Sequence, residues 1–139
     1  MRDNGSPPVR IAVAEDEPDV RKTFVRLLEC LGHKVVCSVG NGEELIDQCK
    51  LDDVDIAFVD LDMPVVDGLV ASQRILAQLP VCIVLSTASY SDEYAEQARN
   101  LGCDFLKKPI LIDTFGAKLV AAYQRFLKEH RPSTSQAAA

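Results

Sequence analysis

Long apolar stretches are absent from this 139-residue sequence. No run approaches the roughly eighteen residues that a membrane-spanning helix needs, and no signal-peptide pattern opens the chain. Positive charge is also scarce, since 15 Lys and Arg against 21 Asp and Glu give a net charge of −6. A nucleic-acid-binding surface needs clustered Lys and Arg, so this balance argues against one. We therefore expect a cytoplasmic domain with neither a membrane segment nor direct nucleic-acid binding.

Metal-binding and nucleophile patterns built on cysteine or histidine are absent as well. The five cysteines are odd in number and lack C-x-x-C spacing: Cys30, Cys37, Cys49, Cys82 and Cys103. Their mostly apolar neighbours favour reduced thiols in the core, with a metal site or a redox switch as the weaker alternative. His33 and His130 fall in a predicted turn and a predicted tail, so neither pairs with a nucleophile.

The length and the 47% apolar content fit one globular domain with a core of ordinary size. Residues 1–8 carry Gly, Ser and two Pro with nothing to bury, so we expect them to be disordered. The folded domain is expected to cover residues 9–128. Residues 129–139 form a polar, Ala-rich tail that is either the start of a linker or a cloning remnant.

Short apolar runs alternate with amphipathic segments along the domain. Strands are predicted at residues 9–14, 34–39, 56–59, 81–85 and 103–106. A first helix is predicted from Pro18 to just before Gly32, and a fourth from about Ser91 to just before Gly102. The second, third and last helices are expected to bury these side chains: Leu45, Ile46 and Cys49; Leu69, Gln73, Leu76 and Leu79; Phe115, Leu119, Tyr123, Phe126 and Leu127.

This order of elements determines the expected architecture. Strands joined through helices by short loops form a parallel sheet, and right-handed crossovers cover both of its faces. We therefore predict an α/β fold with a doubly wound, five-stranded parallel sheet flanked by five helices. In such a sheet, ligands bind in the crevice outside the carboxyl ends of the strands.

Polar side chains follow four of the five predicted strands: Glu15 and Asp16 after the first, Asp60 after the third, Thr87 after the fourth and Lys108 after the fifth. On its own, Asp60 would be explained as a turn cap. Three carboxylates brought to one edge, however, repel one another unless a cation binds. Mg²⁺ prefers carboxylate oxygens with waters and a phosphate, and a Lys and a hydroxyl group would contact the remaining phosphoryl oxygens.

Four segments in this order resemble the receiver domain of two-component response regulators: Glu15-Asp16-Glu17, Asp60-Leu61-Asp62-Met63-Pro64 with Asp67-Gly68, Thr87-Ala88, and Lys108-Pro109. Each motif is short, but their order, strand placement and spacing are specific when taken together. The resemblance runs from about Val9 to Leu127. It implies a CheY-like, flavodoxin-like fold and a role in phosphorelay signal transduction.

The resemblance implies a role for each matching position. Asp60 would be the phosphoacceptor, taking a phosphoryl group from a sensor histidine kinase or a phosphotransfer protein. The implied cofactor is Mg²⁺, and its ligands would be Asp16, Asp60, the backbone carbonyl of Asp62 and, through water, Glu15. Lys108 would contact the phosphoryl group.

Three further roles follow from the same resemblance. Thr87 would be the switch hydroxyl that moves onto the phosphoryl group, with Ser86 as the alternative because both lie at the end of the fourth strand. Phe105 would be the aromatic that reports phosphorylation to the surface around the fourth helix and fifth strand, although strand aromatics are ordinarily packing residues. The peptide bond between Lys108 and Pro109 would be cis.

Two other functions account for parts of the pattern. Asp60-x-Asp62 after an apolar strand resembles the nucleophile motif of haloacid-dehalogenase-like phosphatases, but these carry it on the first strand. A phosphorylation-independent pseudo-receiver, acting as an interaction module, would usually lack the acceptor or the Lys, and this chain has both. We expect no enzyme activity beyond the chain's own phosphorylation and dephosphorylation.

The expected partners are the kinase or phosphotransfer protein and a downstream effector or fused output domain. The stretches at residues 35–45 and 87–91 loosely resemble receivers fused to RNA-binding antiterminator domains. The sequence leaves open whether the chain forms a homodimer and whether it stands alone or belongs to a longer regulator.

Overall fold

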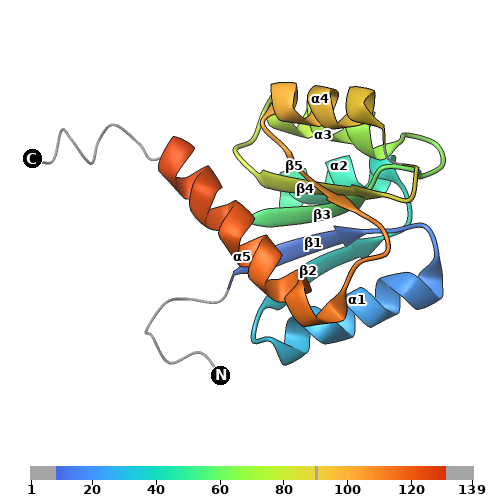
Figure 1. Cartoon of the computed structure of the whole chain (residues 1–139), viewed down its shortest axis with the longest axis vertical. Helices are drawn as coiled ribbons and strands as arrows, with labels where there is room; N and C mark the ends of the chain where they lie inside the picture. The colour runs from blue at the N-terminus through green and yellow to red at the C-terminus, as the bar shows by residue number, and fades with distance from the viewer. Residues whose placement is uncertain (1–8, 90, 131–139) are drawn as a thin grey trace, which may run out of the picture.

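The computed structural model describes residues 9–89 and 91–130, so the predicted disordered segment and residues 131–139 of the tail lie outside the described part. Five strands alternate with five helices (Figure 1): β1 (Arg10–Ala14), α1 (Pro18–Cys30), β2 (Lys34–Val39), α2 (Gly42–Leu51), β3 (Ile56–Asp60), α3 (Gly68–Leu76), β4 (Cys82–Thr87), α4 (Asp92–Leu101), β5 (Asp104–Lys107) and α5 (Ile112–Glu129). This is the predicted order of elements, and α5 continues one residue into the segment assigned to the tail.

All five strands are parallel and form one sheet in the order β2-β1-β3-β4-β5. The predicted doubly wound sheet is therefore confirmed. The strand order changes direction between β1 and β3, and the crevice outside their carboxyl ends is where folds of this kind bind ligands. Because β1 ends at Ala14 and β3 at Asp60, the acidic residues lie at this crevice.

Two apolar layers hold the helices against the sheet, with α1 and α5 on one face and α2, α3 and α4 on the other (Figure 1). On the α1/α5 face, the rings of Phe24, Phe58 and Phe115 contact one another, with centroids 4.8 to 5.2 Å apart. Successive strand residues point to opposite faces. The apolar layer to which a strand residue belongs therefore shows on which face of the sheet the residue two positions further along that strand lies.

The inward face predicted for α3 is partly wrong, because Gln73 is exposed. The buried residues of this helix are Gly68, Ala71, Ser72 and Ile75, whereas Leu69, Leu76 and Leu79 are only half-buried. The reason is a close approach at the start of the helix. A Cβ atom on Gly68 would lie 2.5 Å from the carbonyl oxygen of Asp60, so the helix turns its small side chains toward the sheet.

Smaller corrections concern α5 and the strand bounds. Leu127 was expected to be buried but is 45% exposed. Successive helical residues point about 100° apart, and the neighbouring Phe126 is the one that packs against the core. β4 and β5 each begin and end one or two residues later than predicted, because strand ends depend on pairing across the sheet.

Four of the five cysteines are buried, and all five are free: Cys37, Cys49, Cys82 and Cys103 are buried, and Cys30 is exposed. The prediction of core thiols is confirmed for these four. Burial raises the pKa of Cys82 and that of Cys103 to about 12, so both thiols stay protonated at neutral pH.

The loop between β3 and α3 contains a strained residue. Val65 has a φ of 68°, the only positive value at a non-glycine position among the described residues, and its side chain is 74% exposed. The amide of Val66 donates to the carbonyl of Pro64 at 2.7 Å, which closes a three-residue turn around Val65. A β-branched side chain in this left-handed region costs about 1 to 2 kcal/mol.

Replacing Val65 with Asn is expected to raise the free energy of unfolding by about 1 kcal/mol. Asn tolerates the left-handed region, and an exposed Val has little packing to lose. Urea denaturation followed by circular dichroism measures the change. Val65→Thr is the matched control, because it introduces a polar group but keeps the β-branch. An equal gain in both variants would assign the effect to polarity and contradict backbone strain.

Candidate functional site

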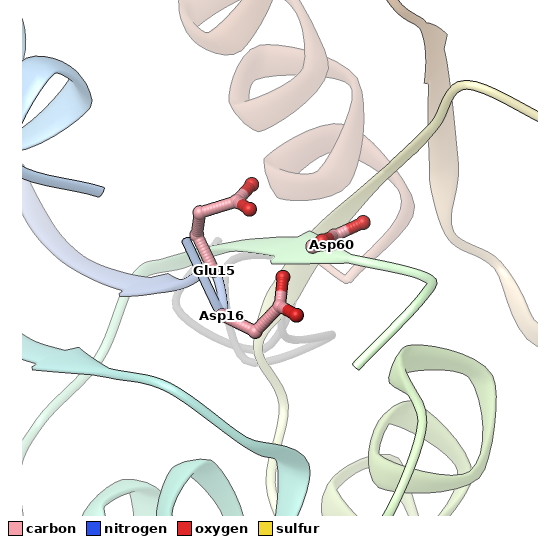
Figure 2. Close-up of side chains that lie close together, drawn as sticks. All are labelled: Glu15, Asp16 and Asp60. Atoms are coloured by element: carbon pink, nitrogen blue, oxygen red, sulfur yellow. The ribbon is translucent and has the colours of Figure 1, made fainter. Parts of the chain in front are cut away.

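Three carboxylates converge at the carboxyl ends of β1 and β3 (Figure 2). One oxygen from each of Glu15, Asp16 and Asp60 lies within 4.8 Å of the others. The sheet register explains this, because Ala14 pairs with Val59 and the next residue along each strand is an acid. Glu15 and Asp60 are 2% and 3% exposed, whereas Asp16 is open to solvent.

Lys108 supplies the positive charge of the site. Its Nζ lies 3.4 Å from Oε1 of Glu15 and 3.6 Å from Oδ1 of Asp60. The main chain holds this residue in place, since its amide donates to the carbonyl of Thr87 at 2.9 Å. The peptide bond from Lys108 to Pro109 is cis, as the resemblance implies.

Burial raises the pKa of Asp60 from 3.8 to about 6. The Asp62 amide opposes this rise by donating to Oδ1 of Asp60 at 3.1 Å, and Lys108 also opposes it. The carboxylates of Glu15 and Asp62 add to the rise. Three carboxylates beside one ammonium group leave an excess of negative charge, which a bound cation would neutralise.

The donor set fits Mg²⁺. This cation takes carboxylate oxygens in octahedral geometry and usually keeps several waters, so a site with one solvent-facing acid suits it. Glu15, Asp16 and Asp60 bring oxygen donors only. The further ligand predicted from the sequence, the backbone carbonyl of Asp62, stays a prediction.

The two hydroxyl residues at the end of β4 lie on different faces of the sheet. Ser86 pairs with Asp60 across the ladder, so both side chains lie on the α1/α5 face. The Ser86 Oγ atom is fully buried and has no hydrogen-bond partner among the described residues. The Thr87 hydroxyl instead donates to Oδ2 of Asp62 at 2.8 Å. The fallback from the sequence, Ser86, is therefore the hydroxyl on the same face of the sheet as Asp60.

Phe105 and the side chain of Asp62 are the two other predicted features. Phe105 on β5 pairs with Leu85 and packs half-buried against the core on the α2/α3/α4 face, opposite Asp60. Asp62 is exposed in the loop after β3, and sequence reasoning missed its side-chain contact with Thr87. Its signal in the sequence was the second acid of the Asp60-x-Asp62 pattern.

The response regulator receiver domain model matches residues 11–120 of the chain. The chain belongs to this family. Structures of known receiver domains agree with the fold. The receiver domain of a modulated diguanylate cyclase from Desulfovibrio desulfuricans has a TM-score of 0.79 at 27% identity, covering 89% of this chain and all of that one. A CheY-like receiver protein from Methanospirillum hungatei has a TM-score of 0.80 at 18% identity, covering 88% and 99%.

Curated relatives of this receiver domain are longer proteins. The transcriptional regulatory protein PdtaR of Mycobacterium tuberculosis is 31% identical over 120 residues, which cover 86% of this chain and 58% of PdtaR. A protein-glutamate methylesterase/protein-glutamine glutaminase of Mesorhizobium japonicum is 37% identical over 95 residues, 68% of this chain and 28% of that enzyme. The receiver domain thus spans less than two thirds of either relative. None of its described helices has the length and apolar character to span a membrane.

Proposed function

We propose that Asp60 of this receiver domain accepts a phosphoryl group from a phosphohistidine on a sensor kinase or phosphotransfer protein. The observation that carries this proposal is the buried Asp60 carboxylate, which lies beside two further acids and a single Lys at the ligand-binding edge of the sheet. In-line phosphoryl transfer needs positioning and charge neutralisation more than covalent help from the protein, and this arrangement provides both.

Each side chain has a defined part in the transfer. Oδ1 of Asp60 accepts from the Asp62 amide, whereas no described residue donates to Oδ2, which is the oxygen we assign to attack. The new O–P bond forms as the N–P bond of the phosphohistidine breaks, and the imidazole nitrogen keeps the electron pair. Glu15, Asp16 and Asp60 would hold Mg²⁺, which would supply charge neutralisation for the phosphoryl oxygens. Lys108, whose Nζ lies 3.6 Å from Oδ1 of Asp60, would also neutralise charge on the phosphoryl group.

Ser86 is the hydroxyl that we assign to the phosphoryl group. It is buried beside Asp60 without a hydrogen-bond partner among the described residues, and an unsatisfied buried hydroxyl gains by approaching a new acceptor. Its movement would displace the end of β4. Phe105 pairs with the neighbouring Leu85, so the change would extend to the surface around α4 and β5.

The output of the signal is assigned to a protein partner or to a further domain. PdtaR is a transcriptional regulatory protein and the Mesorhizobium relative is an enzyme, so similar receiver domains occur in proteins of different activity. We therefore assign to this receiver domain the role of the switch, and not a particular output.

Incubation with acetyl phosphate and Mg²⁺, followed by intact-mass measurement, tests the proposal. The wild type should gain one phosphoryl group, and Asp60→Asn should gain none. Lys108→Ala should react about 100-fold more slowly, as expected when a preorganised charge is removed. Asp67→Asn is the matched control, because this exposed acid caps α3 in the same loop and Asn is also an effective cap.

Two results would contradict the proposal. An adduct that persists in Asp60→Asn would place the acceptor elsewhere. No adduct at saturating Mg²⁺ and acetyl phosphate would favour an interaction module that works without phosphorylation.

A further inference from the structure

Arg21 on α1 reaches back to the main chain between two of the converging acids. Its side chain is half-buried, and its Nη1 atom donates to the carbonyl oxygen of Glu15 at 2.6 Å. That carbonyl belongs to the peptide bond between Glu15 and Asp16, whose side chains leave consecutive positions just after β1 (Figure 2). One guanidinium group therefore fixes the peptide group that joins two of the three acids.

The stability of α1 does not account for this arginine. Arg21 lies in the first turn of the helix, where its amide donates to the carbonyl of Glu17 at 2.9 Å. The helix dipole places partial positive charge at this end, so a cation is slightly unfavourable here. The contact with Glu15 is the interaction that offsets this disadvantage.

Arg21 also lies against the turn that follows β2. A Cβ atom on Gly40 would lie 3.1 Å from Nη1 of Arg21. The φ angle of Gly40 is not positive, so a side chain at this position would be limited by the space that Arg21 occupies. The guanidinium group thus has a defined place between two loops at the ligand-binding edge of the sheet.

The two acids differ in how much else orients them. The amide of Glu15 donates to the carbonyl of Val39 at 3.0 Å, and its Oε1 accepts from Lys108 at 3.4 Å. The Asp16 side chain is exposed, so its carboxylate takes its direction from the main chain. The bond from Arg21 to the preceding peptide group should therefore matter most for Asp16.

We propose that Arg21 is a positioning residue for Mg²⁺ binding, because it fixes the peptide group between Glu15 and Asp16 and so orients both carboxylates before the cation arrives. That these acids bind Mg²⁺ rests on the proposed function. Arg21 is not itself a ligand, since a guanidinium group has no acceptor atom. Its contribution is preorganisation, which lowers the cost of ordering the ligands when the cation binds.

The charge of Arg21 and its hydrogen bond act on Mg²⁺ in opposite directions. The guanidinium group repels a second cation, but solvent and salt screen this repulsion because the side chain is only half-buried. The hydrogen bond has a charged donor, which makes it about twice as strong as a neutral one. We therefore expect that removing Arg21 weakens Mg²⁺ binding, whereas loss of the repulsion alone would strengthen it.

An NMR titration of the unphosphorylated protein with Mg²⁺ tests the proposal. Arg21→Met keeps an unbranched side chain but removes the donors and the charge, so the Kd for Mg²⁺ should rise about tenfold. Arg21→Lys keeps the charge and one donor group, so its Kd should rise only about threefold. Arg26→Met is the matched control, because it removes the same charge from an exposed position farther along α1 and should leave the Kd unchanged.

A second variant displaces the guanidinium group without removing it. The Cβ atom of Gly40→Ala would lie 3.1 Å from Nη1 of Arg21, so the Kd should rise about threefold. In Arg21→Met the same substitution should have no further effect, as a double-mutant cycle predicts for coupled residues. An equal loss in both backgrounds would mean that Gly40 acts independently of Arg21, and would overturn the proposal.

Unchanged or tighter Mg²⁺ binding in Arg21→Met would also overturn the positioning role. At saturating Mg²⁺, the rate of the acetyl phosphate reaction in Arg21→Met should return to that of the wild type, which a general loss of structure would not allow. The titration itself does not depend on phosphorylation. Failure of a Mg²⁺-binding wild type to form any adduct would therefore contradict the proposed function alone. An unchanged Kd in Asp16→Asn would place the cation elsewhere and overturn the role of Arg21.

Discussion

Replacing Gly68 with Ala should lower the free energy of unfolding by about 3 kcal/mol and slow phosphorylation at Asp60. A Cβ atom at this position would lie 2.5 Å from the carbonyl oxygen of Asp60 and 2.9 Å from Cα of Leu61. Both are backbone atoms at the end of β3, and overpacking against atoms that cannot move aside costs about 1 to 3 kcal/mol or more. The start of α3 would have to move away from Asp60.

The Gly68→Ala substitution is expected to affect the candidate site as well as the stability of the fold. The amide of Gly68 donates to the carbonyl of Leu61 at 3.0 Å, so a shifted helix pulls on the residue next to Asp60. Urea denaturation and the rate of the acetyl phosphate reaction measure the two effects. Gly116→Ala is the matched control, because its Cβ would meet only the end of the Leu31 side chain, 2.5 Å from Cδ1, and Leu31 is 41% exposed and can move aside. Equal stability of the two variants would contradict the close packing of α3 on β3.

The order of elements and the acidic edge of the sheet could be predicted because both follow from local patterns. Short apolar runs and amphipathic segments identified every strand and helix, and the carboxyl ends of parallel strands meet at one edge. Glu15, Asp16 and Asp60 were therefore expected at the same edge once the alternation of elements was recognised. Their close approach depends in addition on the pairing of β1 with β3, which local patterns do not give.

The details that the sequence did not determine depend on contacts across the sheet. Ser86 and Thr87 both end β4, and only the pairing of Ser86 with Asp60 shows which hydroxyl lies on the same face of the sheet as Asp60. The buried face of α3 depends on the close approach of Gly68 to β3. The spacing of the leucines in the sequence instead placed Gln73 on the predicted buried face. The bond between Thr87 and Asp62 joins residues 25 positions apart and has no local signature.

In the absence of metal, Asp60→Asn should be more stable than the wild type at pH 7, by about 2 kcal/mol. Burial raises the pKa of Asp60 in the folded state to about 6, against about 3.9 in an unfolded chain. Between these values the folded wild type binds more protons than the unfolded chain. Its stability therefore falls as the pH rises from about 4 to about 6, since ionising a buried carboxylate costs free energy. Asn does not titrate and keeps this stability.

The difference in the free energy of unfolding between wild type and Asp60→Asn should accordingly be near zero at pH 4 and reach its full size above about pH 6. Urea denaturation at several pH values in the presence of EDTA measures it. Asp60→Ala also lacks the titrating carboxylate, so its stability should depend on pH as that of Asp60→Asn does. It should be less stable than Asp60→Asn at every pH, because it also loses buried volume. Parallel pH profiles for wild type and Asp60→Asn would contradict the raised pKa. Mg²⁺ should then narrow the gap at pH 7, because a cation that binds only the folded state stabilises the protein that retains all three carboxylates.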